Sequence, residues 1–224
     1  MSTVLTLLRK ELLLERKVPQ LVPAMALFSV TTFVVFHFAL QQRTVSGDLA
    51  AGILVVTLLF ATMLGLNRLY VSDKEEGGFD AFLLAPVDRT ALGVAKAIAL
   101  FAFLVLLELV MVPAFAILLL GPGMGFEVVG KLVVVLVLVD VGLAVVGTLV
   151  GALAVQTRAR DLIGPLVALP LLVPVVISAA RALSPVLGAA GAGALPGRYL
   201  ALLGLYDLVF GFLSYAVFDF LVED

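Results

Sequence analysis

Three acidic side chains lie inside long apolar stretches of this sequence, where a charge is costly. Glu108, Asp140 and Asp207 are each flanked on both sides by mostly apolar residues. An ionised acid at the centre of a membrane helix costs about 2.5–3.5 kcal/mol, so such groups are protonated, paired or exposed to water. Two interpretations of Glu108 and Asp140 stay open: they share a proton or line a polar path, or they are hydrogen-bonded packing contacts. Arg181 could form an ion pair with Asp207.

The residue types leave little room for other chemistry. The chain has no Cys and one His, which excludes thiolate sites and multi-histidine metal sites within one chain. That residue, His37, is either an interfacial aromatic or a ligand of haem iron. Residues 125–131 match G-x-x-x-x-G-K, but Leu132 follows where a phosphate-binding loop needs Ser or Thr. The sequence therefore predicts a non-catalytic chain with no ATPase of its own and no metal site.

Composition places these residues in an integral membrane protein. The chain is 63% hydrophobic and 13% charged, with a mean hydropathy of +1.24, which is too apolar for a soluble domain. A helix needs about 20 apolar residues to cross the hydrocarbon layer. Six stretches satisfy this length, at about 21–40, 49–71, 94–120, 128–155, 162–181 and 199–221. We expect an all-α fold with six transmembrane helices in one permease-like domain, residues 1–224.

The basic residues predict the orientation. If residue 1 is cytoplasmic, ten of the fourteen Lys and Arg side chains fall inside and four fall outside, as the positive-inside rule requires. Both termini are then cytoplasmic. Residues 1–20 are predicted to form an interfacial helix, ended by Pro19 and Pro23, which serves as a plain anchor or as a gating elbow. Residues 182–198 are predicted to form a re-entrant or surface-lying helical pair.

A polar segment, residues 72–96, interrupts the apolar chain on the predicted cytoplasmic side. Ser72 and Glu75 have capping-box spacing, which predicts a helix start. Large apolar side chains then follow at i, i+3, i+4 and i+7, and the pair of glycines after Glu76 softens the helix by about 1 kcal/mol each relative to Ala. This face either rests on lipid or docks into a groove of a cytosolic partner. Its four residues are Phe79, Phe82, Leu83 and Pro86.

Four stretches together carry a family resemblance. LLRKELLLERK resembles the elbow of type-2 ABC exporter permeases, and GLNRLYVSDKEEGGFDAFLLAPVDRTALGVAK looks like their coupling helix and the start of the third span. The resemblance becomes more specific with two later stretches, QTRARDLIGPLVALPLLVPVVI and the ending YDLVFGFLSYAVFDFLVED. Taken in order, the four resemble the haem exporter protein B family (CcmB) of the cytochrome c maturation system, over nearly the whole chain.

The resemblance implies a permease subunit in a bacterial cytoplasmic (inner) membrane. Its implied partners are a separate ABC ATPase that binds ATP, a second copy of itself, a haem-handling membrane subunit, a small single-span subunit and a haem chaperone, with no nucleic acid. Haem is handled by the complex, and this chain holds no cofactor. The resemblance implies that residues of the polar segment couple the chain to the ATPase. Arg158 and Arg160 either complete this docking surface or only anchor the chain. The residues of the polar segment are Glu75, Glu76, Gly77, Phe79, Phe82, Leu83, Leu84 and Pro86.

Three other functions compete with this interpretation. A type-2 exporter of a drug or lipid would share the fold, although few polar residues are scattered through these spans. An intramembrane enzyme would use Glu108 and Asp140, but no nucleophile–base pair or metal set accompanies them. A scaffold would only bind. An ATPase that co-purifies with the chain would favour an ABC permease over the last two.

Overall fold

The computed structural model describes residues 3–40, 44–75, 89–121, 124–155, 160–188 and 193–221, and these ranges contain helices and connections but no strand. Within these ranges, six helices are long and apolar enough to cross a membrane. The predicted all-α, six-span fold is therefore confirmed. The elements are α1 (Thr3–Lys17), α2 (Leu21–Ala39), α3 (Gly47–Glu75), α5 (Arg89–Phe115), the π-helix η1 (Ala116–Leu120), α6 (Phe126–Val155), α7 (Arg160–Leu183) and α8 (Gly197–Leu221).

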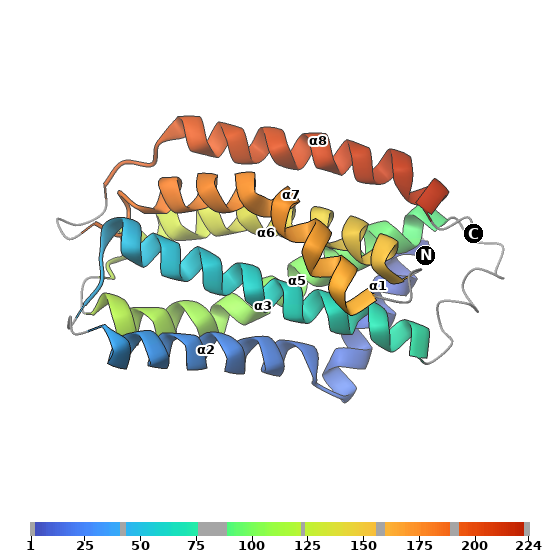
Figure 1. Cartoon of the computed structure of the whole chain (residues 1–224), viewed down its shortest axis with the longest axis horizontal. Coiled ribbons are helices and arrows are strands. Elements are labelled where there is room, and N and C mark those ends of the chain that lie inside the picture. The colour runs from blue at the N-terminus through green and yellow to red at the C-terminus, as the bar shows by residue number, and fades with distance from the viewer. Residues whose placement is uncertain are drawn as a thin grey trace.

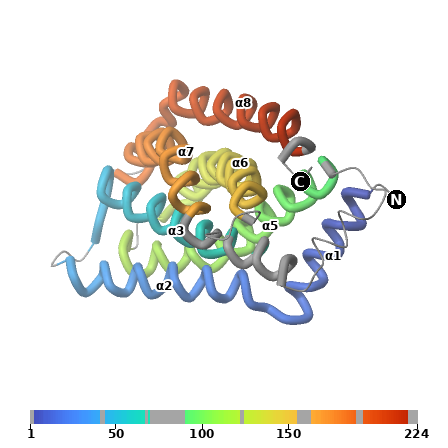
Figure 2. The backbone as a smooth tube through the Cα atoms, turned by 45° about the vertical axis from the view of Figure 1, so that its right-hand side comes forward, coloured from blue at the N-terminus to red at the C-terminus, as the bar shows by residue number. Residues whose placement is uncertain are grey.

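Helices α3 and α6 form the centre of the bundle. In the most apolar part of each helix, 72% of the residues of α3 and 67% of those of α6 are buried, against 22% in α2 and 6% in α8. Helix α6 contacts α3, α5, α7 and α8. Figure 1 shows the six long helices side by side, and Figure 2 shows α6 surrounded by its neighbours, with α1 inclined beside α5. The outer faces of α2 and α8 are thus left for lipid or for other subunits.

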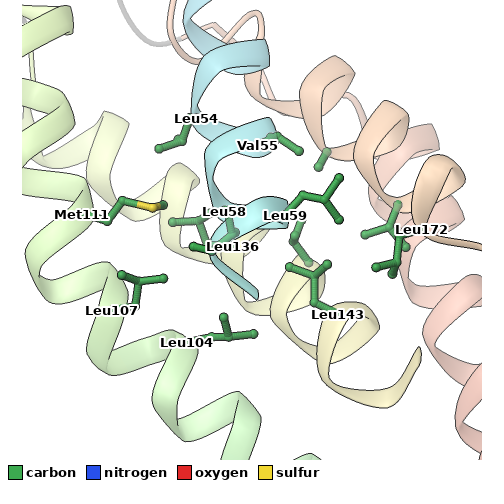
Figure 3. Close-up of a cluster of buried hydrophobic side chains, with 14 of the residues drawn as sticks. Leu54, Val55, Leu58, Leu59, Leu104, Leu107, Met111, Leu136, Leu143 and Leu172 are labelled. Carbon is green, nitrogen blue, oxygen red and sulfur yellow. The ribbon is translucent and has the colours of Figure 1, made fainter. Parts of the chain in front are cut away.

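Leucine packing joins the central helices. Leu58 of α3, Leu107 of α5 and Leu136 of α6 belong to one cluster of buried side chains, and all three are almost fully buried (Figure 3). Lipid is as apolar as these side chains, so close van der Waals contact, and not exclusion from water, holds such helices together.

The sequence prediction of a helix start at Ser72 is wrong. Helix α3 runs without a break through Ser72 and ends at Glu75. Adding one more hydrogen bond to an existing helix is easier than nucleating a new one, so the capping-box spacing is overridden.

The predicted helical pair at 182–198 is also not seen in the described part of that stretch. Helix α7 ends at Leu183, and a hydrogen-bonded turn follows over residues 184–187. Val186 and Leu187 are buried against the bundle, and the N–H of Gly47 donates to the carbonyl of Leu187 at 2.7 Å. The apolar character of this connection is explained by that burial.

Candidate functional site

The elbow between α1 and α2 is closed by a side-chain cap. The Glu15 carboxylate of α1 accepts hydrogen bonds from the N–H of Leu21 at 3.0 Å and from that of Val22 at 2.9 Å. These N–H groups begin α2 and have no partner inside that helix. The negative carboxylate also interacts well with the positive end of the helix dipole. Glu15 therefore fixes the angle at which α1 leaves the first membrane helix.

Replacing Glu15 by Ala is expected to lower the free energy of unfolding by about 1 kcal/mol, the usual cost of a lost helix cap. Thermal unfolding of the purified chain in detergent measures the change. Glu127→Ala is a suitable control, because Glu127 is a 72% exposed acid whose 2.6 Å pair with Lys131 is a surface ion pair. A loss no larger than the control's would show that the cap does not stabilise the elbow.

A buried ion pair lies beside this elbow. The Lys96 ammonium of α5 is fully buried, and it reaches Glu11 Oε1 of α1 at 3.4 Å and the carbonyl oxygen of Leu69 of α3 at 3.1 Å. Glu11 is only 6% exposed, and Lys10 approaches the same carboxylate oxygen at 3.6 Å. One side chain thus joins three helices. We call Glu11, Lys96 and the Leu69 carbonyl the elbow clamp.

The elbow clamp lies next to the predicted coupling segment. Leu69 is six residues before the end of α3, and Lys96 is seven residues after the start of α5, so the two flanks of residues 76–88 meet at one ammonium group. Glu75 is the last residue of α3 and Arg160 the first of α7. The other predicted docking residues lie outside the described ranges, and their role stays a prediction. They are Glu76, Gly77, Phe79, Phe82, Leu83, Leu84, Pro86 and Arg158.

Two of the predicted intramembrane acids are neighbours. The carboxyl groups of Glu108 on α5 and Asp140 on α6 lie close enough to interact. Even so, Oε1 of Glu108 and both carboxyl oxygens of Asp140 are buried without a hydrogen-bond partner. Because a protonated carboxyl group can donate to its neighbour, the shared-proton interpretation and the hydrogen-bonded packing interpretation of the pair both stay predictions.

The predicted pair of Arg181 with Asp207 does not form. Arg181 reaches Asp48 at 3.8 Å, with both side chains exposed, and neither carboxyl oxygen of Asp207 has a hydrogen-bond partner. Asp207 instead lies against Gly142 of α6, where a Cβ atom would stand 2.8 Å from its Oδ1. Arg181 lies two residues before the end of α7, whereas Asp207 lies ten residues into α8, so the two positions differ in depth by about 12 Å.

His37 is held by a backbone carbonyl. Its Nδ1 lies 2.5 Å from the carbonyl oxygen of Leu118 in η1, and because a carbonyl only accepts, Nδ1 carries the proton. The ring also packs edge-on against Phe38. Among the described residues, no group of three or more His, Cys, Asp or Glu side chains could hold a metal ion. These contacts suit an interfacial aromatic, and because they leave Nε2 out, the haem-ligand interpretation stays a prediction.

The elbow clamp was missed by the sequence analysis, which counted Lys96 among the cytoplasmic positive charges. One signal was present: Lys96 follows Ala95 and precedes an apolar run with no other charge before Glu108. A single Lys at that position of a buried helix needs an acid partner. Glu11, itself followed by three leucines, was the matching signal on α1.

Comparisons with known proteins agree with this architecture. The model of the family described as CcmB protein matches residues 2–219. Relatives named Heme exporter protein B are 35% identical over 68% of both chains in Rhodobacter capsulatus, 31% identical over 82% of both chains in Pseudomonas aeruginosa, and 34% identical over 75% of both chains in Paracoccus denitrificans. The family match, over residues 2–219, includes the elbow, the elbow clamp and the three intramembrane acids.

Proposed function

This chain belongs to the CcmB protein family, and on that premise we propose that it is the membrane permease subunit of an ABC-type haem exporter that serves cytochrome c biogenesis. The match over residues 2–219, with relatives named Heme exporter protein B, is the observation that carries the proposal. The six membrane-capable helices support a multi-pass permease. The proposed location is the bacterial cytoplasmic membrane.

The chain itself acts without catalysis in this proposal. A separate ATPase binds and hydrolyses ATP, and it docks on the segment that joins α3 to α5, through Phe79, Phe82 and Leu83. The other proposed partners are a second copy of the chain, a haem-handling membrane subunit, a small single-span subunit and a haem chaperone that is released in its haem-loaded form. The lipid-facing α2 and α8 leave room for such neighbours.

The elbow clamp connects the docking segment mechanically to the membrane helices. Any movement of residues 76–88 displaces the end of α3 or the start of α5, and both are held by Lys96 to α1. Glu15 then joins α1 to the first turn of α2. A push at the segment would therefore move α1, α2, α3 and α5 together.

Changing Phe79 and Leu83 together to Asp is expected to abolish co-elution of the ATPase with the tagged full chain from native membranes, because charge replaces the apolar docking face. Phe126→Asp is the matched control. Phe126 is 98% exposed at the first residue of α6, at the opposite end of the bundle. Equal recovery of the ATPase with both variants would reject the docking face.

A second measurement tests the substrate. In a host whose own copy is deleted, the double variant is expected to lose covalent haem in its c-type cytochromes, seen as loss of haem staining, while the Phe126→Asp protein restores it. If the ATPase co-elutes but deletion leaves the cytochromes fully loaded with haem, the chain is a permease for another substrate.

A further inference from the structure

Three carboxyl groups lie at similar depths in the bundle, within about 6 Å along its axis. Asp140 is 14 residues from the start of α6 and Asp207 is 10 from the start of α8, while Glu108 is 12 residues before the end of η1. At 1.5 Å per residue these positions are about 21, 15 and 18 Å from the same end of the bundle. All three are therefore near the middle of the hydrocarbon layer.

Asp140 is the most fully buried of the three acids. Its side chain is fully buried, and both carboxyl oxygens have no hydrogen-bond partner. The buried side chains of Leu136 and Leu143 lie about one turn to either side of it on α6 (Figure 3). The polar group that it faces is the Glu108 carboxyl of α5. Two carboxylates can only accept hydrogen bonds, so this buried pair needs a proton before one carboxyl group can donate to the other.

Among the side chains that the structure describes, the basic groups on the helices around the pair have other partners. On α5, Lys96 is held by Glu11, and on α6, Lys131 is held by Glu127. On α7, Arg181 lies with Asp48. On α8, Tyr206 donates its hydroxyl to the carbonyl of Leu171, and Asp207 rests on Gly142. Two ionised carboxylates side by side in this setting would repel each other and lack water.

A proton fits this site better than a metal ion. Hard cations take six or more oxygen ligands, whereas the described residues bring only two carboxyl groups together and contain no cluster of three metal-ligating side chains. A single proton removes one charge and supplies the missing donor, so that an acid O–H donates to the neighbouring carboxylate.

We propose that Glu108 and Asp140 form an intramembrane proton-binding site, in which one proton is held between the two carboxyl groups. Asp140 is the buried member. Glu108 is the member that exchanges the proton, because it is half-buried at the edge of the bundle, next to Leu109, which is 69% exposed. The site does not depend on what the protein transports. Separation of α5 from α6 would release the proton and leave two charged acids.

The test uses dicyclohexylcarbodiimide, an apolar reagent that modifies protonated carboxyl groups within membranes, on the full chain in its membranes. Peptide mass spectrometry is expected to find Glu108 modified at neutral pH. With Asp140→Asn, the pH profile of Glu108 labelling is expected to shift by about one unit or more, because the carboxyl group that shares its proton is gone. Asp207→Asn is the matched control, and it should leave the profile in place.

Several outcomes would overturn the proposal. An Asp140→Asn profile identical to that of the wild type would mean that Glu108 holds its proton alone. Protection of Glu108 by Na⁺ or K⁺ at constant pH would identify a cation site instead. Because reagent access could fail, infrared spectra of the purified protein provide a second readout. A carboxylic-acid carbonyl band altered by both Glu108→Gln and Asp140→Asn, but not by Asp207→Asn, is expected, and its absence would reject the shared proton.

Discussion

Glu11→Gln is expected to destabilise this protein by about 3–5 kcal/mol, which is the usual cost of leaving one charge of a buried ion pair without its partner. The Lys96 ammonium is fully buried and would lose the carboxylate 3.4 Å away. Unfolding in detergent, followed by loss of helical circular dichroism, measures the change. The effect should be the largest of any substitution at the elbow, because the Lys96 ammonium that Glu11 neutralises joins the helices at both flanks of residues 76–88.

Two further variants separate this ion pair from a general weakness of α1. Lys10→Ala removes a 47% exposed ammonium from the same carboxylate and should change stability by no more than about 1 kcal/mol. Glu11→Gln combined with Lys96→Met should recover much of the loss, because no charge is then left buried. A double variant as unstable as the sum of its single variants would show that the two groups do not act as a pair.

The membrane helices could be predicted because length and apolar composition alone define them. Six runs of about 20 apolar residues have few other structures available in a hydrocarbon layer, and the described ranges contain six such helices. Glu108 and Asp140 could also be predicted to be neighbours, because both lie near the middle of consecutive antiparallel helices. Depth along a helix can be read from the sequence.

What could not be predicted is which way a side chain points around its helix. Lys96 and Arg181 both lie near helix ends, yet the first is fully buried and the second is exposed. The apolar runs of α3 and α6 are uniform around the helix, so no periodicity marks their contact faces. The Glu11–Lys96 pair joins positions 85 residues apart, and only the packing of α1 on α5 brings them together.

Gly93→Ala is expected to destabilise the contact of α5 with α8 by about 1–3 kcal/mol, although Ala is the better helix former. A Cβ atom at Gly93 would stand 2.6 Å from Cδ2 and Cε2 of Phe218, whose ring is buried. Gly130 of α6 offers the matched control, since no atom lies within 4 Å of its added Cβ. Gly130→Ala should therefore stabilise the protein by up to about 1 kcal/mol, and the two identical substitutions should have opposite signs.

The way in which the clash is relieved decides the size of the effect. A cavity of about 200 Å³ lies between α5, α6 and α8, lined in part by Gly93, Ser214, Tyr215 and Phe218. Rotation of the Phe218 ring into this cavity is the easiest relief, because the backbone of neither helix has to move. Phe218→Leu in the Gly93→Ala background should then restore most of the lost stability, because the shorter side chain no longer reaches the new methyl group. If it restores nothing, the added methyl group acts on the backbone of α5 and not through the ring.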